Sequence, residues 1–197
     1  MRRTTECPGC GLELPVEPAA PEVPLNASKE CAAVYAEVSG FEFEHPVMLR
    51  YHQLSVDPYG AQHAGTPTTP IRLGYSLAGL WLALEHGFSG DEVRAVHARM
   101  GHVQDWWPAF EPPTGAARMT VRDVAEQGVR RGSSTGHATA TRAWAEAVWR
   151  SWTAERPTVA SDVEQLLRRL FVCEGQQPLR GTVGPAGAVY RLIGLLE

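Results

Sequence analysis

The chain has 197 residues, 44% of them hydrophobic, which is enough to bury one domain-sized core with a small appendage. It carries 18 basic and 22 acidic residues, for a net charge of −4, and shows no basic stripe. This charge balance argues against nucleic acid as a partner.

The sequence also bears on where the protein works. It contains no run of about 18 apolar residues that could cross a membrane. Arg2 and Arg3 are not followed by the apolar stretch of a signal peptide. We therefore expect a cytoplasmic protein with no membrane partner. In that compartment a Cys-x-x-Cys pair is typical of metal binding or redox chemistry rather than of a structural disulfide.

Helical periodicity and capping residues predict most of the elements. Residues 1–27 should form a knuckle and a linker, because Pro15, Pro18 and Pro21 exclude a helix or an inner strand. Ser28 is a good N-cap for the helix that follows. Helices are predicted over 28–39, 46–63, 71–86, 89–100, 120–130, 137–153 and 159–171.

Two segments stay open at this point. Asp57 and Pro58 could divide the 46–63 helix in two, since Asp is a good N-cap and Pro suits the first helical position. The tail over 172–197 is rich in Gly and Pro, and its apolar end fits a helix or a strand. Together the elements predict an all-α fold: a bundle of about six helices over 28–171, behind a small N-terminal zinc knuckle.

The most informative motif is the run Cys7-Pro8-Gly9-Cys10-Gly11, with Cys31 a short loop away. A Cys-x-x-Cys turn presents two thiolates to one side, and Cys31 can add a third near a helix N-terminus. The motif therefore predicts a Zn²⁺ site with a structural role, or alternatively a redox pair. Cys173 is far along the chain, and four nearer residues could supply the fourth ligand: Glu30, His45, His52 and His63.

A second constellation consists of histidines. His52 and His63 lie eleven residues apart, about three helical turns, with Asp57 between them. His137 could join them from another helix of the bundle. We interpret these four residues as candidate catalytic groups, in which Asp57 orients a histidine or acts as a base. The alternative is that the histidines are surface or core residues and that Asp57 is an N-cap.

The 137–153 helix carries an aromatic face. Trp144, Val148 and Trp152 follow a helical repeat, which fits core packing. They could instead line a pocket for an apolar or planar ligand, with Trp106 and Trp107 as its lid.

The CPGCG knuckle, Cys31, the stretch from His52 to His63 and the stretch from His137 to Trp149 together resemble DUF5946, an uncharacterised bacterial family. The resemblance covers roughly residues 5–170 and implies a cytoplasmic, helical, metal-holding protein without an established activity. It places ten residues on recurring motif positions: Cys7, Cys10, Cys31, His52, Asp57, Tyr59, Gln62, His63, His137 and Trp144.

The chain departs from this pattern in two places. The family usually has alanine at Pro58 and proline at Ala64. It often has a histidine between the Cys-x-x-Cys pair and the third cysteine, whereas residues 11–30 here contain none.

Two functions follow as hypotheses. In the first, the protein is an enzyme acting on a small molecule in a His/Trp-lined cleft, where Tyr59, Gln62 and Trp144 bind the substrate. In the second, it is a non-catalytic, zinc-stabilised module that binds a protein partner or another copy of itself, or senses thiol oxidation.

Overall fold

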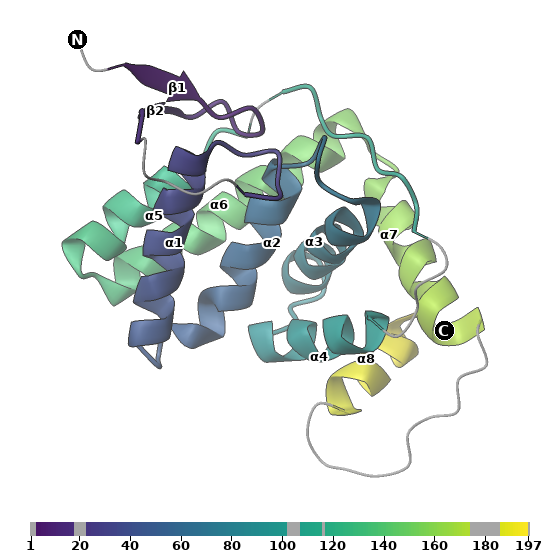
Figure 1. The fold of residues 1–197 in the computed structure, drawn as a ribbon. Helices are drawn as coiled ribbons and strands as arrows, with labels where there is room; N and C mark the ends of the chain where they lie inside the picture. The colour runs from purple at the N-terminus through teal and green to yellow at the C-terminus, as the bar shows by residue number, and fades with distance from the viewer. Residues whose placement is uncertain (1–2, 18–22, 102–106, 116, 174–185, 197) are drawn as a thin grey trace.

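The computed structural model describes residues 3–17, 23–101, 107–115, 117–173 and 186–196. Within these ranges the fold is mostly helical, with one two-stranded sheet, which confirms the predicted fold class (Figure 1). The elements are β1 (Thr4–Glu6), β2 (Glu13–Pro15), α1 (Lys29–Glu44), α2 (His52–Gln62), α3 (Pro70–Leu84), α4 (Gly90–Met100), α5 (Val121–Gln127), α6 (Ser134–Glu155), α7 (Val159–Arg168) and α8 (Ala186–Leu196).

Three short helical segments complete this list. The 3₁₀ turn η1 (Leu49–Tyr51) precedes α2, η2 (Val129–Arg131) follows α5, and a π-helical turn, η3 (Arg169–Cys173), follows α7. No helix in the described ranges is both long and apolar enough to span a membrane.

The strands β1 and β2 form an antiparallel hairpin in which Thr5 lies opposite Leu14. The hairpin covers the end of the molecule where α1 begins (Figure 1). Its loop holds the cysteine knuckle, and Gly11 in that loop has a φ of 71°, a left-handed conformation that favours glycine. The knuckle thus faces the first turn of α1.

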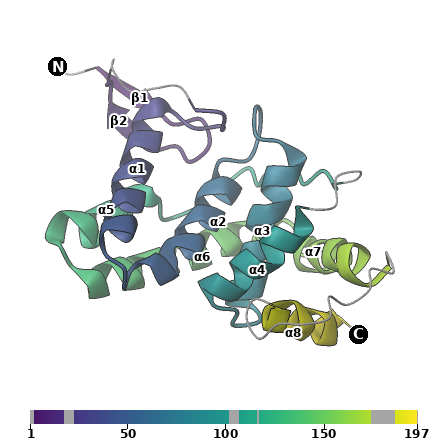
Figure 2. The ribbon, with the colours of Figure 1, turned by 60° about the horizontal axis from the view of Figure 1, so that its bottom comes forward.

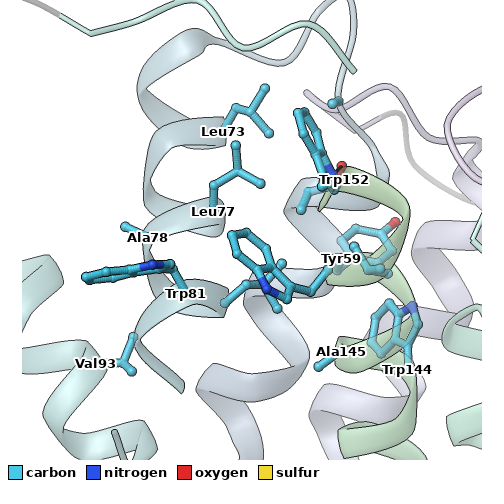
Figure 3. Packing of buried hydrophobic residues seen from close by; sticks show 14 of the residues in the cluster. Tyr59, Leu73, Leu77, Ala78, Trp81, Val93, Trp144, Ala145 and Trp152 are labelled. Atoms are coloured by element: carbon cyan, nitrogen blue, oxygen red, sulfur yellow. Dashed lines mark hydrogen bonds between the residues drawn. The ribbon is translucent and has the colours of Figure 1, made fainter. Parts of the chain in front are cut away.

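The core lies between α2, α3 and α6. Leu73 and Leu77 of α3 point toward Trp152 of α6, and Trp144 lies further along α6 (Figure 3). Trp144 and Trp152 are both buried, so they belong to the core that their spacing favoured.

The helix α2 does not break at Pro58. It runs continuously from His52 to Gln62 with this proline inside it. Pro58 has no N–H to donate to the carbonyl of Leu54, so the helix loses one internal bond there and is held by packing on α3 and α6. The two ends of α2 are therefore kept apart, and His52 and His63 with them.

The apolar end of the chain is the helix α8. It packs beside α4, with Leu192 and Leu196 buried (Figure 2). Arg191 fastens it further through an ion pair with Glu92 at 2.9 Å.

Candidate metal centre

Three elements bring four side chains to one point. Cys7 and Cys10 come from the loop between β1 and β2, and Cys31 lies in the first turn of α1. His63 follows directly after the last residue of α2. All four side chains are buried, with exposed fractions between 0% and 4%.

The knuckle loop is closed by its own backbone. The Gly11 N–H donates to the Cys7 carbonyl and the Cys7 N–H donates to the Leu12 carbonyl, both at 2.9 Å. Gly9 lies so close to α2 that a Cβ there would be 2.7 Å from the His63 ring. Only glycine allows the knuckle this close approach to the histidine.

The four ligand atoms are close enough to hold one metal ion. The Cys10 and Cys31 sulfurs are 3.7 Å apart, and the Cys31 sulfur is 3.4 Å from His63 Nε2. Within the described ranges, these four residues are the group whose ligand atoms all lie within 4.8 Å of one another.

A second layer of contacts orients these ligands. His63 Nδ1 lies 2.7 Å from the Tyr59 carbonyl, so Nδ1 carries a proton and the ring is turned with Nε2 toward the sulfurs. The Ser28 N–H donates to Cys7 Sγ at 3.4 Å, and the Cys31 N–H donates to the Ser28 hydroxyl at 3.1 Å. Both ring and thiolate positions are thus fixed before any metal binds.

The loop after α2 is tied to the chain segment before α1. The Asn26 side chain donates to the Ala64 carbonyl at 2.7 Å, and the Thr68 hydroxyl donates to the His63 carbonyl at 2.6 Å. These bonds fix His63 relative to the turn that precedes Cys31.

Without a cation the cluster shares its protons unevenly. Hydrogen bonds from Cys10 and Cys31 lower the pKa of Cys7. The pKa of Cys31 is raised by the contacts of Cys31 with the Cys10 and Cys7 thiols. Burial acts to lower the pKa of His63, but hydrogen bonds to Cys10 and Cys7 outweigh it and raise the pKa to about 9. A divalent cation would take the place of these protons.

The other candidates for a fourth ligand lie elsewhere. Glu30 accepts the Glu17 N–H at 3.1 Å, and His45 is 2.8 Å from the Phe41 carbonyl.

His52 and His137 meet at a residue that the sequence analysis did not single out. Glu42 is fully buried; its Oε2 accepts from His52 Nδ1 at 2.8 Å and from the Ser55 hydroxyl at 3.0 Å. Its Oε1 accepts from His137 Nε2 at 2.9 Å. Glu42 follows buried Val38 by one helical turn, and this spacing was the available signal for a carboxylate on the inner face of α1.

The remaining predicted site residues occupy separate places. Asp57 is buried and accepts from the Gln53 side-chain amide at 2.9 Å. Gln62 accepts from Trp144 Nε1 at 2.9 Å and donates to the Met119 carbonyl at 2.8 Å, which ties α2 to α6. Tyr59 stacks on Tyr35, with ring centroids 3.9 Å apart.

The predicted catalytic residues are therefore distributed over three environments. His63 lies with the cysteines, His52 and His137 lie on Glu42, and Asp57 lies near α3 and α4. Of the two predicted lid residues, Trp107 stacks on Tyr75 with centroids 5.2 Å apart, and Trp106 lies outside the described residues.

A cleft of about 360 Å³ adjoins the metal centre. It lies between the knuckle, the end of α2, the 112–115 loop and α6, and its lining includes Cys7, Gln62 and Trp152.

Comparison with known proteins gives a family without an assigned activity. No curated protein and no solved structure matches the chain. The family described as "Family of unknown function (DUF5946)" matches residues 5–153, which span the knuckle, the four ligands and the helices through most of α6. The chain therefore belongs to the DUF5946 family.

Proposed function

We propose that Cys7, Cys10, Cys31 and His63 bind one Zn²⁺ ion that fastens the N-terminal hairpin to the helical body. Tetrahedral Zn–S bonds of about 2.3 Å place two sulfurs about 3.8 Å apart. The Cys10–Cys31 separation of 3.7 Å agrees with this edge, and it carries the proposal. Three thiolates and one imidazole form a common zinc ligand set.

The same ligand count supports a structural role. A catalytic zinc keeps one position for water or substrate, whereas here four protein groups lie close enough together to supply all four ligands of a tetrahedral ion. The ion would join the hairpin, the start of α1 and the end of α2. Its bond to His63 would add to the Tyr59 contact that already orients the ring.

The test compares two histidine variants by elemental mass spectrometry after dialysis against a moderate zinc chelator. Wild type should retain one zinc per chain. His63→Ala should lose it, because only three ligands remain. The matched control, His52→Ala, removes an imidazole from the Glu42 cluster and should retain zinc. A His63→Ala protein that holds zinc as tightly as wild type would contradict the four-ligand proposal.

Redox sensing is the second candidate, favoured by the closeness of Cys10 to Cys31 and by the cleft that reaches Cys7. A peroxide would oxidise two thiols to one disulfide, be reduced to two waters, and release the zinc. Stoichiometric peroxide should then release zinc within minutes and give one disulfide per chain by mass spectrometry. Zinc that stays bound with all thiols reduced would exclude this role.

A further inference from the structure

A second cleft, remote from the metal ligands, surrounds the carboxyl group of Asp57. Its volume is about 220 Å³, and it lies between η1, α2, the start of α4 and α6. Four charged residues contribute to its lining: Arg50, Asp57, Asp91 and Arg142. None of the four metal ligands lines this cleft.

Asp57 is held in one position at the inner side of this cleft. It is 3% exposed, and its Oδ1 accepts from the Gln53 amide at 2.9 Å. On its other side the carboxyl group rests on α3 at Gly79, where a Cβ would lie 2.0 Å from Oδ2. Gly79 therefore makes the room that the carboxyl group occupies.

The environment of Asp57 favours its neutral form. Burial raises the pKa of this carboxyl group well above its usual range, and the single bond from Gln53 only partly opposes that effect. A neutral carboxylic acid carries a proton that it can donate to an oxygen acceptor. A buried acid without a cation beside it is expensive to retain for stability alone, which favours a role in binding.

The exposed charged residues of the lining are two arginines, Arg50 and Arg142, and one aspartate, Asp91. Asp91 is already paired with Arg94 on the exposed face of α4. Arg50 lies over the Tyr51 ring, 5.3 Å from its centroid, and donates through Nε to the Val47 carbonyl. Arg142 pairs with Glu146 at 3.0 Å, an exposed contact of the kind that an incoming anion can replace.

We propose that this cleft binds a small organic acid that carries a second oxygen acceptor. The ligand's carboxylate pairs with Arg50 and Arg142 at the mouth of the cleft. The ligand's second oxygen acceptor, which is separate from the carboxylate, accepts a hydrogen bond from the protonated Asp57 at the inner side. The volume of about 220 Å³ limits the ligand to a few carbon atoms. Oxo- and hydroxy-acids of this size have the required pair of groups.

The test uses three probes of similar size in an amide NMR titration of the zinc-loaded protein. 2-Oxobutyrate has both groups, butyrate lacks the second oxygen, and 2-butanone lacks the carboxylate. We expect saturable shifts at Gly90 and its neighbours with 2-oxobutyrate, and at least tenfold weaker binding of the other two, about 1.4 kcal/mol. Equal binding of butyrate, or no saturable shift at the cleft, would overturn the proposal.

Three variants separate recognition from folding. Arg142→Gln should weaken 2-oxobutyrate binding about tenfold. Arg150→Gln, an arginine on α6 that lines a different groove, should leave it unchanged. Asp57→Asn keeps the shape of the side chain and a hydrogen-bond donor, so this variant should still bind 2-oxobutyrate. If Arg142→Gln binds 2-oxobutyrate as tightly as wild type, the proposed contacts are wrong.

Discussion

Glu42 is tightly constrained, because one buried carboxylate accepts from three donors on two other helices. His52 and Ser55 reach it from α2, and His137 reaches it from α6. A buried carboxylate is retained only when such partners replace the water it has lost. This cluster therefore joins α1, α2 and α6 at the end of the bundle away from the hairpin.

Removing this charge should destabilise the fold strongly. Glu42→Gln should lower the free energy of unfolding by about 3 kcal/mol, because one amide cannot accept from both imidazoles. The exposed Glu44 provides the control: Glu44→Gln should change the free energy of unfolding by less than about 0.5 kcal/mol. Urea unfolding at pH 7 followed by circular dichroism measures both, and equal stability of the two variants would show that the cluster is dispensable.

The same residue predicts a dependence on pH. Burial acts to raise the pKa of Glu42, but hydrogen bonds from His137, His52 and Ser55 outweigh it and lower the pKa in the folded state. Its stabilisation is therefore present above the ordinary glutamate pKa of about 4.3 and is lost as pH falls through the lowered value. Glu42→Gln should lack this part of the acid-induced loss of stability.

The sequence predicted three of the four residues of the candidate metal centre, because a Cys-x-x-Cys turn and a nearby third cysteine carry their geometry locally. It left His63 as one of four alternatives, since only the packing of α2 against the knuckle selects it. Glu42 was missed for the same reason: its partner His137 is 95 residues away in the chain.

The first turn of α1 connects helix formation to the metal centre. The Ser28 hydroxyl caps this helix by accepting the Cys31 N–H, and the Ser28 N–H donates to Cys7 Sγ. The positive end of the helix dipole acts against the rise that the neighbouring thiols and burial cause in the pKa of Cys31. The cap therefore acts on two of the cysteines.

Comparison of two caps tests this connection. Ser28→Ala and Ser89→Ala should each lower the free energy of unfolding by about 1 kcal/mol, because each removes an N-cap acceptor. Only Ser28→Ala should also weaken zinc binding, as measured by competition with a chromophoric chelator. Equal zinc affinity in both variants would contradict a role for Ser28 in the centre.

Helices were predictable where apolar spacing and caps agree, as in α4 with its Ser89–Glu92 capping box. The course of α2 was left open, because local rules allow a boundary at Asp57 and Pro58, and the packing of α2 on α3 and α6 keeps the helix continuous. The apolar end of the chain fitted a helix or a strand by sequence, and its contact with α4 in the structure resolves this choice.

The molecule combines a well-packed helical body with a hairpin that cannot be stable by itself. Strands of three residues are too short for independent stability, and the hairpin adds few large apolar side chains to the core. The attachment of residues 3–17 therefore rests on contacts with the helical body: buried Leu12 and Leu14, the bond from the Glu17 N–H to Glu30, and the contacts at the knuckle. The metal ion that we propose would be the strongest of these, and its removal should act locally.

Hydrogen exchange of the zinc-loaded and chelated protein tests that expectation. Removal of the metal should raise exchange in β1, β2 and the first turn of α1 by at least tenfold, while amides of α3 and α6 stay protected. The protected helices act as the internal control for global folding. Uniform loss of protection would mean that the whole fold depends on the metal. Unchanged exchange in all of these segments would contradict a structural role for the metal.

X-ray absorption at the zinc edge of the purified protein tests the central claim most directly, since it reports the ligands themselves. We predict one zinc per chain, surrounded by three sulfurs at about 2.3 Å and one nitrogen at about 2.0 Å. A shell made mainly of nitrogen and oxygen, or a chain that binds no stoichiometric zinc, would contradict the assignment of Cys7, Cys10, Cys31 and His63 as its ligands.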